Sequence, residues 1–175
     1  MSEDVTRVLL IGYGNPGRLD DGLGPALAEA VAGLDLPHVT VDADYQLTVE
    51  DAAQVAEHDV VVFADADVAG PEPFTFRRIS PRRNLSFSSH DCDPQAVLAL
   101  AHDLLKATTT GYVLAIRGYE FNEFGESLSL QARANLKEAL DFIDTTIRER
   151  SFERRAANRD ELIRIDEPSL SGDQR

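Results

Sequence analysis

Several residue types are scarce in this chain, and each scarcity argues against a class of protein. A single cysteine, Cys92, cannot form an internal disulfide, which fits a reducing compartment. The 17 Lys and Arg residues against 31 Asp and Glu residues give a formal net charge of −14, which argues against nucleic acid as a partner, because phosphate binding needs a basic surface. No apolar run approaches the roughly 18 residues of a membrane span, and no signal h-region follows the acidic start, so we expect a cytoplasmic protein with no membrane segment.

The chain does contain enough apolar sequence to build one core. Its 175 residues, of which 43% are hydrophobic, suffice for one ordinary domain. We place this α/β domain at residues 1–155, because the sequence beyond about Arg155 becomes charged and irregular. Residues 156–175 are therefore expected to form a poorly packed tail. We expect the chain to be a monomer.

Strands alternate with helices along the chain, which indicates a parallel sheet covered on both faces. Apolar runs at residues 5–11 and 59–67 are typical of central strands that are buried on both sides. The alternation over residues 74–78 instead indicates a half-exposed or edge strand. We expect a three-layer α/β/α sandwich, phosphorylase/hydrolase-like, with a twisted, mostly parallel sheet of about five strands. The other expected elements are strands at 38–42 and 111–118 and helices at 24–32, 48–57, 94–105 and 129–147.

The loop after the first strand has a glycine pattern that admits more than one interpretation. Gly12-x-Gly14-x-x-Gly17 formally satisfies the dinucleotide fingerprint, which presents bare N–H groups to a pyrophosphate. Here Pro16 removes one N–H, and the acidic pair 20–21 would face the phosphates, so the charge has the wrong sign. A plainer alternative is that these acids only cap the following helix.

Asp21, Asp65 and His90 are the candidate site residues. Asp21 and Asp65 each follow a buried strand, and in a parallel sheet such positions meet at the edge where ligands bind. His90 lies in the loop before a helix that begins at Pro94, and can reach that edge; a surface role is its plain alternative. Two carboxylates and an imidazole suit a divalent metal. Without one, two charges ~4 Å apart repel by roughly 4 kcal/mol at an effective dielectric of 20, so a cation or a proton must offset them.

Two known families share parts of these motifs. Gly-x-Gly-Asn-Pro-Gly resembles the opening of peptidyl-tRNA hydrolases, but that family continues with an Arg-His-Asn catalytic segment where this chain has Leu19-Asp20-Asp21. Gly-x-Gly-Asn followed by Asp-Asp-Gly-x-Gly resembles the [NiFe]-hydrogenase maturation proteases. This second resemblance extends over residues 5–147, with matches at Asp65, at Ser89-His90 before Pro94, and in the segments 116–121 and 125–129. Asp21 stands where that family's motif often has Glu.

The second resemblance implies a specific reaction. It implies an endopeptidase, of an aspartic or nickel-dependent type, that removes the C-terminal extension of the nickel-loaded hydrogenase large-subunit precursor. Asp21, Asp65 and His90 would bind the nickel that is already in the precursor, so the precursor supplies the metal. A peptidyl-tRNA hydrolase-like hydrolase and a non-enzymatic nickel-site chaperone remain alternatives. Cys92, close to His90 in sequence, is a minor candidate for a nucleophile or a further soft ligand.

A cluster of arginines stands out in this acidic chain. Arg77, Arg78, Arg82 and Arg83 lie at and after the expected edge strand. Such a run is usually a solvated surface, and its alternative is a docking surface for a partner.

Overall fold

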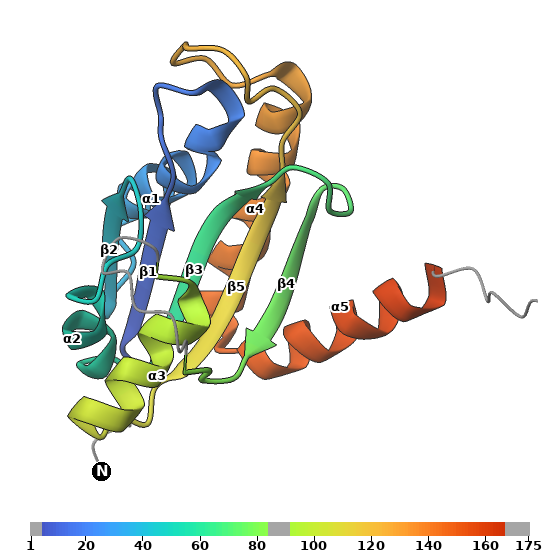
Figure 1. Ribbon diagram of the computed structural model, residues 1–175. Coiled ribbons are helices and arrows are strands. Elements are labelled where there is room, and N and C mark those ends of the chain that lie inside the picture. The colour runs from blue at the N-terminus through green and yellow to red at the C-terminus, as the bar shows by residue number, and fades with distance from the viewer. Residues whose placement is uncertain (1–4, 84–91, 167–175) are drawn as a thin grey trace, which may run out of the picture.

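The computed structural model contains one five-stranded sheet with helices on both faces (Figure 1). It describes residues 5–83 and 92–166, the last seven of these by their backbone only. The strands are β1 (Val8–Tyr13), β2 (Val39–Asp44), β3 (Val60–Asp67), β4 (Phe74–Ile79) and β5 (Thr110–Arg117). The helices are a short 3-10 turn η1 (Leu19–Gly22), α1 (Leu23–Gly33), α2 (Asp51–Ala56), α3 (Pro94–Leu105), α4 (Leu130–Glu149) and α5 (Phe152–Asp166).

The strand order is β2-β1-β3-β5-β4, with β3 at the centre. β1 pairs in parallel with β2 and β3, and β3 pairs in parallel with β5, whereas β4 is antiparallel to β5. The three-layer α/β/α fold with a mostly parallel sheet is therefore confirmed. The strand expected from alternation at 74–78 is indeed an edge strand, which fits its burial on one face only.

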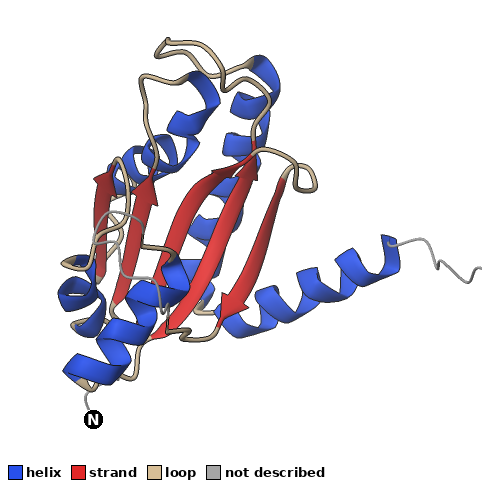
Figure 2. Cartoon of the chain, in the orientation of Figure 1, coloured by secondary structure: helices blue, strands red, loops and turns tan. Residues whose placement is uncertain are grey.

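Alternate residues of the strands face two separate hydrophobic clusters, as the two-residue period of a strand requires. Leu9, Ile11, Val61 and Phe63 contribute to the cluster under α2 and α3. Their neighbours along the same strands pack on the opposite face against α1 and α4. Figure 2 shows α3 in front of the sheet and α4 behind it. This division matters for the site, because Tyr13 and Asp65 fall on the α2–α3 face by the same period.

Helices α3 and α4 each begin at a capping side chain. The Asp93 side chain accepts a hydrogen bond from Ala96 N at 2.8 Å at the start of α3, and Pro94 occupies the first turn. The Ser129 hydroxyl accepts from Ala132 N at 3.2 Å at the start of α4. α2 is shorter than expected: it begins at Asp51, not at residue 48.

The chain beyond residue 155 differs from the expected poorly packed tail. Residues 152–166 form α5, which packs against β4 with Phe152 and Ala156 buried. Arg159 lies over the Phe74 ring at 3.8 Å and donates to the Phe74 carbonyl oxygen at 2.9 Å. Arg159 also lies 4.9 Å from the Phe142 ring, so a cation over aromatic rings contributes to the packing of this helix. Residues 167–175 lie outside the described residues, and within the described ranges no helix is long and apolar enough to cross a membrane.

Candidate functional site at the carboxyl edge of the sheet

The loop from β1 to α1 folds tightly over the end of the sheet. Gly14 has a φ of +138°, and a Cβ at this position would overlap the main-chain oxygen of Asp21, so only glycine fits. The Asn15 side chain accepts from Gly17 N at 2.9 Å and closes the turn. The loop then enters η1, which carries Asp20 and Asp21 at the edge of the sheet.

The two neighbouring aspartates have opposite environments. Asp20 is fully buried and accepts four hydrogen bonds from the segment 119–129: from Tyr119 N (2.8 Å), Glu120 N (3.0 Å), Ser129 N (2.8 Å) and the Ser129 hydroxyl (2.7 Å). Burial alone would raise the pKa of Asp20, but these hydrogen bonds outweigh it and hold the pKa below its usual value. Asp20 therefore ties the loop to a distant segment and is not available to a ligand.

Asp21 is only partly buried and keeps its carboxylate close to the turn. Its Oδ2 accepts from Asn15 N at 2.8 Å, and Asp21 lines a pocket beside β1. The sequence alone could not divide the roles of this acidic pair, because both residues precede the same helix. The division follows from the loop at 119–129, which lies about a hundred residues away along the chain.

Asp65 lies on β3, next to the strand that leads to Asp21. Its Oδ1 accepts from Ala66 N at 2.7 Å, and Tyr13 donates a hydrogen bond to its side chain. Burial raises the pKa of Asp65 to about 6, and the negative charge of Asp21 adds to this rise, while the hydrogen bonds from Ala66 and Tyr13 oppose it. Burial and the charge of Asp65 also raise the pKa of Tyr13, so the phenol stays protonated and can donate.

Asp21 and Asp65 line one pocket of about 230 Å³. The structure thus brings together two of the three predicted site residues, whereas His90 lies outside the described residues. The other residues around this pocket are Tyr13, Gly14, Tyr45, Gln46, Leu47 and Cys92. Within the two described ranges, no group of three His, Cys, Asp or Glu side chains is placed to hold a metal ion. Sequence reasoning did not assign Tyr13 to the site, although the strand period after Leu9 and Ile11 places it on the same face.

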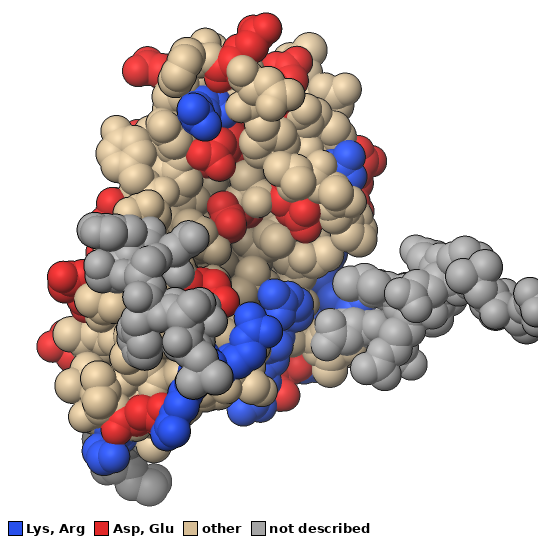
Figure 3. Space-filling view, in the orientation of Figure 1, with Lys and Arg blue, Asp and Glu red and all other residues tan. Residues whose placement is uncertain are grey.

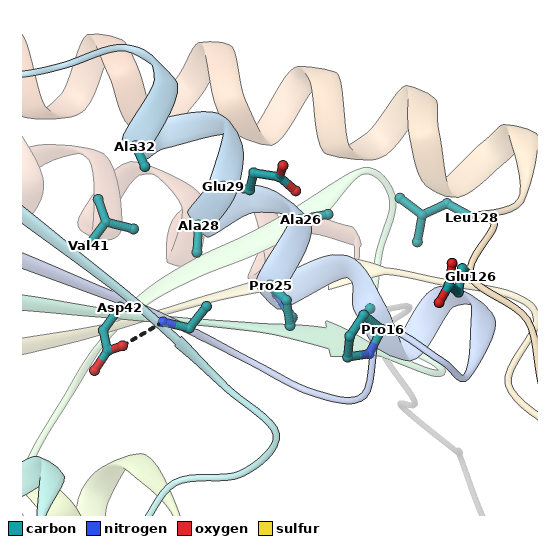
Figure 4. Close-up of a pocket in the computed structure, with 12 residues that line it drawn as sticks. Pro16, Pro25, Ala26, Ala28, Glu29, Ala32, Val41, Asp42, Glu126 and Leu128 are labelled. Atoms are coloured by element: carbon teal, nitrogen blue, oxygen red, sulfur yellow. Dashed lines mark hydrogen bonds between the residues drawn. The ribbon is translucent and has the colours of Figure 1, made fainter.

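Of two further pockets, one is lined by Asp65 and the other by neither Asp21 nor Asp65. A pocket of about 330 Å³ adjoins the first, because Tyr13 and Asp65 line both. A larger pocket, of about 530 Å³, lies between α1 and β2 (Figure 4). Pro16 and Gly22 reach it from the loop, but neither Asp21 nor Asp65 lines it. Both carboxylates therefore line the pocket of about 230 Å³, and Asp65 also lines the pocket of about 330 Å³.

Comparison with known proteins places this site in a known fold. No family model matches the chain, and no curated protein is significantly similar to it in sequence. Among solved structures, the [NiFe] hydrogenase maturation protease HycI from Thermococcus kodakarensis KOD1 is 21% identical with a TM-score of 0.64, over 82% of this chain and 93% of that one. The hydrogenase maturating endopeptidase HybD from E. coli is 20% identical with a TM-score of 0.60, over 82% and 93%. An uncharacterised protein from Wolinella succinogenes is 25% identical with a TM-score of 0.57, over 81% and 96%. The chain described here therefore has the fold of the [NiFe]-hydrogenase maturation proteases.

Proposed function

We propose that this protein is an endopeptidase that removes the C-terminal extension of a nickel-loaded [NiFe]-hydrogenase large-subunit precursor. The observation that carries the proposal is the shared pocket of Asp21 and Asp65, at the carboxyl ends of two neighbouring parallel strands. Solved structures with this fold include proteins named as hydrogenase maturation proteases, and the motifs around both residues resemble that family.

The chemistry of the two carboxylates supports nickel as the group they recognise. Backbone N–H groups of Asn15 and Ala66 hold one oxygen of each carboxylate, which fixes its orientation. Carboxylate oxygens and imidazole nitrogens are accepted ligands of divalent first-row metals. A shared cation would also offset the repulsion between Asp21 and Asp65. We propose His90, in the segment before α3, as the third ligand.

Three protein ligands leave part of a metal's coordination shell open. In this proposal the precursor's own ligands complete the shell, so the nickel is part of the substrate. The residues of this chain then have two tasks: they recognise the metal centre, and they place the extension along the edge of the sheet. Cleavage would follow nickel insertion and would leave a nickel-free precursor intact.

The test mixes the purified protein with nickel-loaded and nickel-free forms of a large-subunit precursor and measures intact mass over time. We expect the nickel-loaded precursor alone to lose a C-terminal fragment. Asp21→Asn, Asp65→Asn and His90→Ala should each abolish processing. Asp44→Asn, an exposed acid at the end of the neighbouring strand β2, is the charge-matched control and should process like the parent.

The same experiment separates the alternatives. Binding of the loaded precursor without shortening would favour a nickel-site chaperone and would refute the peptidase. Equal shortening of loaded and nickel-free precursor would remove nickel recognition from the proposal.

A further inference from the structure

The pocket of about 330 Å³ next to the carboxylate pair carries arginine side chains. Arg77 from β4 and Arg82 from the following segment line it together with Tyr13 and Asp65. On the α2–α3 face of the molecule, a band of basic side chains crosses the surface below acidic side chains that surround a hollow (Figure 3). In a chain with a net charge of −14, cations beside the candidate site require an explanation.

Arg77 differs from the other three arginines of the cluster. Three of them pair with acids: Arg78 with Glu153 at 3.0 Å, Arg82 with Asp93 at 3.3 Å and Arg83 with Asp103 at 2.6 Å. Within the part of the chain that the structure describes, no carboxylate lies within 4.0 Å of the Arg77 guanidinium. Arg77 lies on β4 opposite Val113, and it lines the pocket of about 330 Å³ that Asp65 also lines.

The other acids around this pocket already have partners. Asp67 Oδ1 accepts from Ala69 N at 3.1 Å and from Gly70 N at 2.9 Å, which closes the turn after β3. Asp93 caps α3 and pairs with Arg82. Asp65 faces the pocket that it shares with Asp21. Among the described residues, no acid around this pocket pairs with Arg77, and a ligand that spans from one pocket to the other would meet its charge.

We propose that Arg77 binds a carboxylate of the polypeptide substrate next to the bond that is cleaved. This inference rests on the proposed function, because it takes the substrate to lie across Asp21 and Asp65. A chain held there continues into the adjoining pocket, where the planar guanidinium can bind a carboxylate through two parallel hydrogen bonds. The carboxylate is either an Asp or Glu side chain or the C-terminal carboxylate of the extension. Arg77 thus selects substrates by charge, in addition to their metal.

The test compares the parent, Arg77→Gln and Arg83→Gln. Arg83 belongs to the same cluster but lines neither pocket, so its variant is the charge-matched control. The dissociation constant for nickel-loaded precursor is measured by biolayer interferometry, and kcat and KM by intact mass. We expect Arg77→Gln to raise both the dissociation constant and KM about tenfold with little change in kcat, as loss of one charge-assisted contact predicts. Arg83→Gln should match the parent. Arg77→Lys keeps the charge but cannot make two parallel hydrogen bonds, so its dissociation constant and KM should lie between those of Arg77→Gln and the parent. If Arg77→Gln misfolds, Arg77→Lys takes its place in the test.

Precursor variants identify the source of the carboxylate. One set changes the acidic side chains that flank the cleavage site to Asn or Gln, and another adds Gly-Ser residues that displace the terminal carboxylate. The tenfold difference between the parent and Arg77→Gln should vanish for the set that removes the true partner. A difference that persists in both sets, or equal binding by the parent and Arg77→Gln, would overturn the inference.

The outcomes also separate this inference from the proposed function. If the parent and Arg77→Gln process the precursor equally, the role of Arg77 is refuted and the peptidase function stands. Arg77-dependent binding without shortening refutes the peptidase and keeps the carboxylate site. A parent that binds no form of the precursor refutes both.

Discussion

The buried carboxylate of Asp20 provides a quantitative test of the loop architecture. Asp20→Asn is nearly isosteric and leaves no cavity, but it replaces one acceptor oxygen by a donor NH₂ group. Oδ2 accepts three of the four hydrogen bonds and Oδ1 accepts the fourth, from Ser129 N. The best orientation of the amide therefore keeps its oxygen at Oδ2 and leaves Ser129 N facing another donor.

The expected loss of stability follows from these contacts. An unpaired buried N–H costs about 1–3 kcal/mol, and the three remaining bonds become neutral and weaker than bonds to a charged acceptor. We expect Asp20→Asn to lower the free energy of unfolding by about 3 kcal/mol, a large share of the roughly 5–15 kcal/mol that holds a protein folded. For a chain of this size, that corresponds to a fall in Tm of about 6–12 °C.

The matched control is the same substitution one residue along the chain. Asp21 accepts one backbone hydrogen bond, from Asn15 N, which an Asn side-chain oxygen can also accept. Asp21→Asn should therefore cost less than about 1 kcal/mol. Urea and thermal unfolding followed by circular dichroism measure both variants. Equal losses for the two, or a change below about 0.5 kcal/mol for Asp20→Asn, would refute the assigned role of Asp20.

The pH dependence of stability gives an independent check that the pKa of Asp20 is lowered by folding. The pKa of Asp20 is depressed in the folded state, so its contribution is present above the unfolded pKa of about 3.9 and is lost as pH falls through the folded value. Asn binds no proton in this range. The stability gap between the parent and Asp20→Asn should therefore be constant near neutral pH and narrow below about pH 4. A gap that widens in acid would contradict the hydrogen-bond account.

Three further outcomes are expected. In the metal-free protein, the folded-state pKa of Asp65 is raised to about 6, so ionisation of Asp65 destabilises the fold as pH rises from about 4 to 6. Asp65→Asn should therefore raise Tm at pH 7.5 and change Tm little at pH 4. A gain in Tm that is the same at both pH values would contradict this reasoning. Gly24→Ala should unfold or strongly destabilise the protein in thermal melts, because a Cβ there would lie within 2.5 Å of the Ala64 carbonyl oxygen, whereas Gly33→Ala, with nothing within 4 Å, should be tolerated. Calorimetry on the isolated protein should detect weak nickel binding, at micromolar dissociation constants or above, and nanomolar affinity would show that the protein has a resident metal.

The sequence predicted those parts of the fold that depend on local patterns. Continuous apolar runs identified β1 and β3 as central buried strands, and alternation identified β4 as a half-exposed or edge strand. The caps Asp93 and Ser129 are local features too, because a capping side chain acts within three residues of itself. The same reasoning placed Asp21 and Asp65 at one edge, since the ends of parallel strands meet there.

What sequence reasoning could not supply depends on contacts between distant segments. The burial of Asp20 depends on residues 119–129, and no local pattern distinguishes it from Asp21. The packing of α5 depends on Arg159 over Phe74, in a stretch whose charge suggests a solvated tail. The charge of Arg77 becomes notable only when the pairing of the other three arginines is known.

The contacts of Asp20 also have a consequence for the order of events during synthesis. The segment with Asp21 leaves the ribosome well before residue 119, yet every hydrogen-bond donor to the Asp20 side chain among the described residues lies at or beyond that residue. The strands β1, β2 and β3 are all complete by residue 67, but the loop after β1 can take its final position only after Ser129 has emerged. A nascent or truncated chain that ends before this residue therefore has the strands of the site without the site itself.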